Sequence, residues 1–171
     1  DHNKIMVLHV IDEASKYHTA KIVREGKVSK YSDLGNCDAP DLISAISEWA
    51  RYFQHPHCVH VDEEGCFHSE LFKDCGGLKS VEVKMAAGEA HWQNGIVERH
   101  IGTFRELFNK LQLEDVFDGA TNQTIVDSVC EAKNRNGTYN GTSPSQWLLG
   151  KSRHPLIDAS EASPMITRIC V

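Results

Sequence analysis

The chain has 171 residues, of which 40% are hydrophobic and 25% are charged, and this size and composition suit one globular domain with its own core. No run of residues approaches the roughly 18 apolar positions of a membrane span, so we expect no membrane association. The formal net charge of −6 argues mildly against a nucleic-acid partner, although the distribution of charge matters more than the sum. The six cysteines are irregularly spaced without a C-x-x-C pair, which favours reduced thiols and an intracellular location.

The first third of the chain predicts two strands and a helix. Residues 5–12 are apolar and β-branched, as in a buried strand, and residues 17–24 predict a second strand after a short polar turn. Residues 25–38 are polar and contain glycine, which predicts a loop. Residues 39–53 have apolar side chains at the helical period and an early proline, so they predict an amphipathic helix.

The rest of the chain predicts short strands between helices. We expect strands at 58–62 and 78–83, and helices at 69–75, 92–111, 121–134 and 144–149. A loop of small residues, MAAGEA, precedes the long helix. Strands that alternate with helices in this order predict an α/β layered domain.

Charge is unevenly distributed along the C-terminal third. Residues 113–131 carry acidic side chains and no Lys or Arg, whereas residues 133–153 carry Lys133, Arg135, Lys151 and Arg153 and no acid. A basic patch is therefore expected in the second segment, where it would suit contacts with phosphates.

Two carboxylates fall where a metal site would need them. Asp62 ends a predicted strand, and Glu98 lies near the start of the long helix, with 35 residues between them. Carboxylate oxygens are the ligands that Mg²⁺ and Mn²⁺ prefer, and two such metals activate a hydroxyl and stabilise the leaving oxygen of a phosphodiester. The chain has 24 acidic residues, so this spacing also arises by coincidence.

Three segments give the pair a context. They read QHPHCVHVDEEGCFHS at 54–69, HWQNGIVERH at 91–100 and NGTSPSQWLLG at 140–150. Together they resemble the integrase catalytic core of retroviruses and LTR retrotransposons, in which D-x-G-x-x-F-x-S is followed by Q-x-N-G-x-[apolar]-E-R and S-P-x-x-[apolar]-x-x-G. The resemblance extends from about residue 5 to residue 155.

The resemblance implies a ribonuclease H-like fold, in which a mixed sheet is flanked by helices. Residues 1–155 would form the catalytic core and residues 156–171 a C-terminal extension or linker. The implied activities are metal-dependent 3′-end processing and strand transfer into target DNA, by a homodimer or higher multimer that works in the nucleus. The alternative is a non-catalytic, retroelement-derived fragment that serves as a DNA- or protein-binding scaffold.

The resemblance also assigns individual residues. Asp62 and Glu98 would be the catalytic carboxylates and the ligands of a two-metal Mg²⁺ or Mn²⁺ site. Gly95 would let the backbone flex beside the scissile phosphate. The residues implied in DNA binding are Gln93, Asn94, Arg99, Arg105, Lys151 and Arg153.

The third carboxylate of such a site is not evident in the chain. Asp12 precedes Asp62 by a suitable interval, but the resemblance places Asp12 on the family's second strand, where the aspartate is usually not a ligand. Its carboxylate would instead cap the turn by bonding Ser15 or nearby backbone N–H groups. The ligand would then lie upstream of Asp1, on a central first strand that this chain lacks, with residues 1–4 as the hairpin turn. Such a fragment is expected to be inactive by itself.

Overall fold

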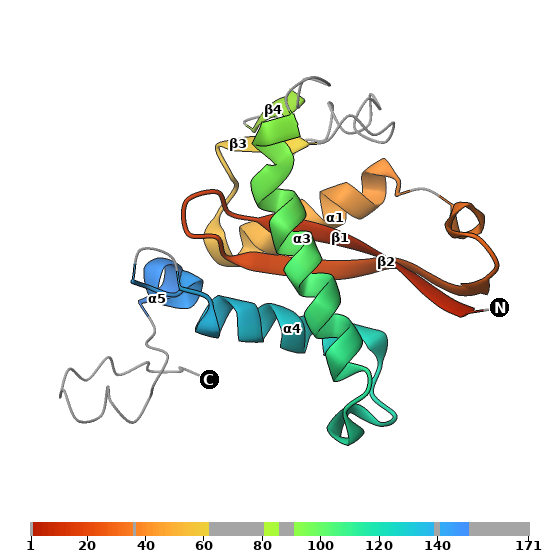
Figure 1. The fold of residues 1–171 in the computed structure, drawn as a ribbon. Helices are drawn as coiled ribbons and strands as arrows, with labels where there is room; N and C mark the ends of the chain where they lie inside the picture. The colour runs from red at the N-terminus through yellow and green to blue at the C-terminus, as the bar shows by residue number, and fades with distance from the viewer. Residues whose placement is uncertain (1, 36, 62–80, 86–90, 139–140, 151–171) are drawn as a thin grey trace, which may run out of the picture.

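The computed structural model describes residues 2–35, 37–61, 81–85, 91–138 and 141–150. The strands in these ranges are β1 (His2–Ile11), β2 (His18–Val28), β3 (Cys58–Val61) and β4 (Glu82–Met85). The α-helices are α1 (Ala39–Phe53), α3 (His91–Leu111), α4 (Asn122–Asn136) and α5 (Pro144–Leu149), and short 3-10 helices lie at Tyr31–Leu34 and Asp115–Phe117. The sequence predicted all of these strands and α-helices, although several ends are shifted (Figure 1). The predicted helix at 69–75 lies outside the described residues, as does the segment 151–171.

A long antiparallel hairpin forms the centre of the described structure. Its register runs from His2 opposite Val28 to Ile11 opposite His18, and the connecting turn is short. The turn between residues 12 and 17 is closed by two backbone hydrogen bonds, of which one runs from the N–H of Asp12 to the carbonyl of Tyr17 at 2.9 Å. The hairpin thus supplies a two-faced ribbon against which the helices pack.

The hairpin is longer than the sequence predicted, and two expectations were wrong. Residues 2–4, expected in a turn, belong to β1, and residues 25–28, expected in a loop, belong to β2. The side chain of Asn3 donates a hydrogen bond of 2.9 Å to the carboxylate of Glu25, across the strands. This end of the ribbon is held by backbone pairing and polar cross-strand contacts, so no apolar alternation marks it in the sequence.

The second pair of strands is parallel. Cys58 lies opposite Glu82 and Val61 opposite Met85, so the predicted strand at 58–62 is confirmed and the one at 78–83 begins later, at Glu82. No hydrogen-bonded strand joins this pair to the hairpin within the described ranges, and the strands form two separate two-stranded sheets.

Helix α1 covers one face of the hairpin. Its buried residues Leu42 and Ile46 pack with Val61 and Val81, and Leu8 of β1 packs against the same cluster. At the turn, the ring of Tyr17 lies edge-on to those of Trp49 and Phe53 of α1, with centroids 6.2 and 5.2 Å away. In Figure 1 this helix lies behind the hairpin, while α3 crosses in front.

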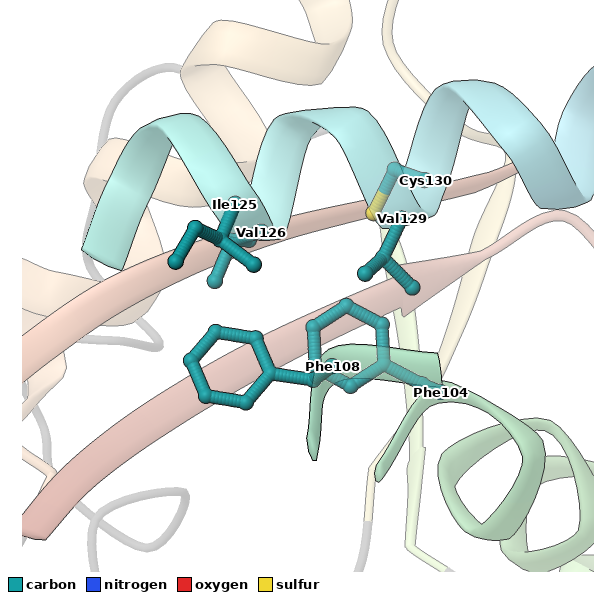
Figure 2. Close-up of a cluster of buried hydrophobic side chains, with 6 residues drawn as sticks. All are labelled: Phe104, Phe108, Ile125, Val126, Val129 and Cys130. Atoms are coloured by element: carbon teal, nitrogen blue, oxygen red, sulfur yellow. The ribbon is translucent and has the colours of Figure 1, made fainter. Parts of the chain in front are cut away.

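Helices α3 and α4 cover the opposite face through a second cluster of buried side chains. Figure 2 shows Phe104 and Phe108 of α3 directed toward Ile125, Val126, Val129 and Cys130 of α4. Val126 and Val129 are fully buried, and Ile5 and Val7 of β1 pack against this cluster. Ile5 and Val7 alternate in sequence with residues that face away, which is the period expected of a strand covered on both faces. None of the helices in the described residues is long and apolar enough to span a membrane.

Candidate functional site

The candidate site is centred on the N-terminal half of α3, which begins at His91, one residue before the predicted start. Glu98, Arg99 and Arg105 are exposed along this helix, on the side away from the buried Phe104 and Phe108. The side chains of Gln93 and Asn94 lie outside the part that the structure describes, so their proposed DNA contacts stay predictions.

The exposed side of α3 has an open strip between its charged residues. Glu98, Gly102 and Arg105 follow one another at intervals of four and three, so they share one helical face. Among the described residues, a Cβ atom built on Gly102 or on Gly95 would meet nothing within 4 Å. Neither glycine is required by close packing, although glycine within a helix costs about 0.5–1 kcal/mol relative to alanine. The strip therefore leaves the helix backbone accessible beside a carboxylate and a guanidinium.

Asp62 itself lies outside the described residues. Strand β3 ends at Val61, directly before it, and Val61 is buried in the cluster under α1. In Figure 1 the β3–β4 pair and the N-terminal half of α3 are at the same end of the molecule. The approach of the Asp62 carboxylate to that of Glu98 is untested by the structure and remains a prediction.

Asp12 is part of the hairpin turn. Its carboxylate accepts hydrogen bonds from the backbone N–H of Ser15 at 2.7 Å and from the Ser15 hydroxyl at 2.6 Å. Ser15 is buried, and its own hydroxyl accepts a bond from the N–H of Tyr17 at 3.1 Å. The expectation that Asp12 caps its turn toward Ser15 is confirmed.

The expected basic patch on residues 133–153 is divided. Arg135 is exposed and pairs with Glu131 one helical turn earlier, at 3.1 Å. Lys133 instead turns inward, and its ammonium donates to the carbonyl of His100 at 2.5 Å. Burial lowers the pKa of Lys133 to about 8. Lys151 and Arg153 lie outside the described residues.

A cluster of histidines under α3 and α4 was not predicted from the sequence. His18 is fully buried, and its Nε2 lies 2.9 Å from Nδ1 of His9. Asn134 of α4 accepts from the His18 N–H and donates to the His18 carbonyl, each at 2.8 Å. Phe104 contacts both rings, edge-on to His9. The only local signal was that His9 falls within an apolar strand.

The histidine cluster is kept uncharged by its surroundings. Burial is the main cause that lowers the pKa of His9 and of His100 to about 4 and that of His18 to about 2, and the positive charge of Lys133 adds to each effect. Neutral imidazoles in contact are suited to a packed core. Within the described residues, no three His, Cys, Asp or Glu side chains are grouped so as to hold a metal ion.

Comparisons with known proteins bear on the fold. No family model matches the chain, and no curated protein matches it. Among solved structures, the chain is similar to the HTLV-2 integrase catalytic core domain in complex with magnesium in its dimeric form, at 15% identity and a TM-score of 0.61, over 89% of this chain and 94% of that one.

Two further solved structures have a similar fold. The catalytic core domain of BIV integrase has 12% identity and a TM-score of 0.64, over 94% of this chain and 91% of that one. The simian T-cell lymphotropic virus intasome in complex with PP2A regulatory subunit B56 gamma has 15% identity and a TM-score of 0.60, over 99% of this chain and 56% of that one. The chain therefore has the mixed α/β, ribonuclease H-like fold of retroviral integrase catalytic cores, as the sequence predicted.

Proposed function

We propose that this chain is the catalytic core of an LTR-retroelement integrase, which processes DNA 3′ ends and transfers them into target DNA. The observation that carries the proposal is the fold, shared with integrase structures over 89–99% of the chain. On that fold, residues 93–99, which read Q-N-G-x-x-E-R, lie in the first turns of α3, where Glu98 is exposed. Fold alone does not define chemistry, so the proposal rests on the two together.

The chemistry of the donor set fits a divalent metal. Glu98 is exposed and takes part in none of the ion pairs found among the described residues, so its carboxylate is available as a ligand. Asp62 and Glu98 would hold Mg²⁺ or Mn²⁺, which would supply activation of the attacking hydroxyl and stabilisation of the leaving oxygen. The HTLV-2 core of the same fold was solved with magnesium.

DNA would be held by local positive charge, since the chain as a whole is acidic at −6. Arg99 and Arg105 are exposed on α3, on either side of the open strip at Gly102, where a phosphate backbone would approach the helix closely. Lys151 and Arg153 are proposed to extend this surface. Because integrases of this fold are described as a dimer and as an intasome, we propose a homodimer or higher multimer that binds element ends and target DNA in the nucleus.

The position of the third carboxylate determines whether this chain could be catalytically active by itself. Asp12 already accepts two hydrogen bonds from Ser15, so its carboxylate is committed to the turn. We place the third ligand on a strand that precedes Asp1, and the chain by itself would then be inactive. The same observation favours the second candidate function, a non-catalytic, retroelement-derived scaffold for DNA or protein.

A strand-transfer assay distinguishes the integrase function from the scaffold function. In a protein that supplies the preceding strand, Glu98→Gln should lower the joining of oligonucleotides by orders of magnitude, because it removes a charge that holds the metal. DNA binding should change little, since it depends on Lys and Arg contacts with phosphates. Glu106→Gln, on the same helix, is the matched control and should join DNA normally. Near-normal joining by the Glu98→Gln protein would show that Glu98 is not a metal ligand, whereas DNA binding without any joining by the unmodified protein would favour the scaffold.

A further inference from the structure

A cavity of about 330 Å³ lies between α3, the C-terminal end of α4, the start of α5 and the β1–β2 turn. Its polar lining comes from Lys16 of the turn, Arg99 and His100 of α3, and Lys133 of α4. Leu107, Ala132 and Pro144 supply apolar wall. In Figure 1, α5 and the end of α4 lie near the β1–β2 turn.

The charge of this cavity is of one sign. Lys16, Arg99 and Lys133 line it, and no Asp or Glu of the described residues does. None of these three takes part in the ion pairs found among the described residues. The positive charges of all three also lower the pKa of His100, which lines the same cavity, after the larger effect of burial.

The hydrogen bonds of the two lysines do not neutralise this charge. Lys133 donates to the His100 carbonyl, and Lys16 donates to the carbonyl of Glu13. An ammonium has three donors, and a carbonyl accepts one of them without carrying a formal charge. A lysine near the end of α4 also complements the helix dipole, but that effect accounts for one cation and not for three.

The backbone of Lys16 has a conformation that is unfavourable for lysine, and the packing of the residue does not explain it. Its φ angle is 63°, in the left-handed region where glycine and asparagine are favoured over other residues. A lysine at this position is accounted for if its charge is used in the cavity.

We propose that this cavity binds a phosphate group. Three cations around a partly apolar, partly enclosed space attract an oxyanion more strongly than they would in open water. Arg99 offers a fork of N–H donors that matches two phosphate oxygens, and the lysines add point charges. The volume is at the low end for small-molecule sites, about 300–1,000 Å³, and suits a phosphate with part of an attached sugar. The phosphate would come from a nucleic-acid backbone or from a small phosphate compound.

The first test is a titration of the ¹⁵N-labelled chain with inorganic phosphate, followed by amide chemical shifts. Saturable shifts are expected at Lys16, His100 and Gly137, which surround the cavity. Lys133→Gln should weaken the affinity about tenfold, because it removes one charge-assisted contact. Arg135→Gln, two residues along α4 and outside the cavity lining, is the matched control and should leave the affinity unchanged.

A second variant guards against a folding defect in Lys133→Gln. Lys16→Asn removes a charge but suits the left-handed backbone, so it should keep the fold and still weaken phosphate binding by about the same factor. The proposal is wrong if phosphate causes no saturable shift at these amides, or if Lys133→Gln and Arg135→Gln weaken binding equally.

A short DNA duplex distinguishes the two sources of the phosphate. If the backbone supplies it, the duplex shifts the same amides, inorganic phosphate competes with it, and Lys133→Gln weakens DNA binding. If a small compound supplies it, inorganic phosphate still binds but the duplex leaves these amides unmoved. Neither outcome depends on the carboxylates Asp62 and Glu98, so a failed metal site would leave this proposal standing.

Discussion

The two sides of α3 differ in what their residues do. One side carries Phe104 and Phe108, which are 4% and 6% exposed and pack on α4 (Figure 2). The other carries Glu98, Gly102 and Arg105, which are exposed, and a Cβ atom built on Gly102 would meet no other described residue within 4 Å. The buried side of the helix stabilises the fold and the exposed side carries the residues proposed for chemistry, so substitutions on the two sides should have different consequences.

The largest effect is expected on the buried side. Phe104→Ala should lower the free energy of unfolding by about 3–5 kcal/mol, because it leaves a cavity against α4 and removes the ring contacts with His9 and His18. Urea denaturation followed by circular dichroism measures this. Asn109→Ala, exposed on the same helix, is the control and should change stability by less than about 0.5 kcal/mol. Similar losses for the two variants would contradict the assignment of the core.

A smaller but still large effect is expected at Asn134. Its amide satisfies both backbone groups of the buried His18, so Asn134→Ala should lower the free energy of unfolding by about 2–3 kcal/mol. Asn134→Asp keeps the shape and the acceptor but loses the donor to the His18 carbonyl, and it should be no better than alanine. An aspartate variant as stable as the original protein would show that the bond to the carbonyl is unimportant.

The histidine cluster predicts a dependence of stability on pH. The pKa values of His9 and His100 fall to about 4 and that of His18 to about 2, below the value of 6.5 for an unfolded histidine. Between pH 6.5 and 4 the unfolded chain therefore binds more protons than the folded chain. Stability is fully present above pH 6.5 and is lost as pH falls, by on the order of 1 kcal/mol per pH unit for each histidine. Urea midpoints at pH 7, 6 and 5 measure this, and a constant midpoint would contradict the buried neutral cluster.

The smallest effect on stability is expected on the exposed side. Glu98→Gln and Arg105→Gln should each change the free energy of unfolding by less than about 0.5 kcal/mol, since neither side chain is buried. The same urea titrations serve here. A loss of more than 1–2 kcal/mol at Glu98, a range typical of a structural contact, would show that its carboxylate holds the fold together.

Much of the fold followed from local sequence. The helices α1, α3 and α4 were predicted because their apolar residues repeat at the helical period, and the Asp12 turn because aspartate and serine at that spacing bond one another. The ends of β1 and β2 were missed because residues 2–4 and 25–28 are polar and gain their structure from backbone pairing. Pairing of that kind has no signature in side-chain pattern.

The site was harder to predict than the fold. Lys133 was predicted to belong to a basic surface patch. In the structure, α4 directs it toward the carbonyl of His100, a contact between residues 33 positions apart. His9, His18 and Asn134 meet only because the hairpin and α4 pack together, since His18 and Asn134 are 116 positions apart in the sequence. Such contacts are tertiary, so no local sequence pattern predicts them. The proposed approach of Asp62 to Glu98 would also be a tertiary contact.

The measurement that tests the central proposal most directly is the location of a bound metal. Mn²⁺ is paramagnetic and broadens the amide signals nearest to it, so a titration of the ¹⁵N-labelled chain should selectively broaden Val97, Glu98 and Gly102. In Glu98→Gln this broadening should be lost, whereas Glu106→Gln, two turns further along α3, should retain it. Equal broadening in the Glu98→Gln protein and the original would contradict the metal site and, with it, the proposed integrase chemistry.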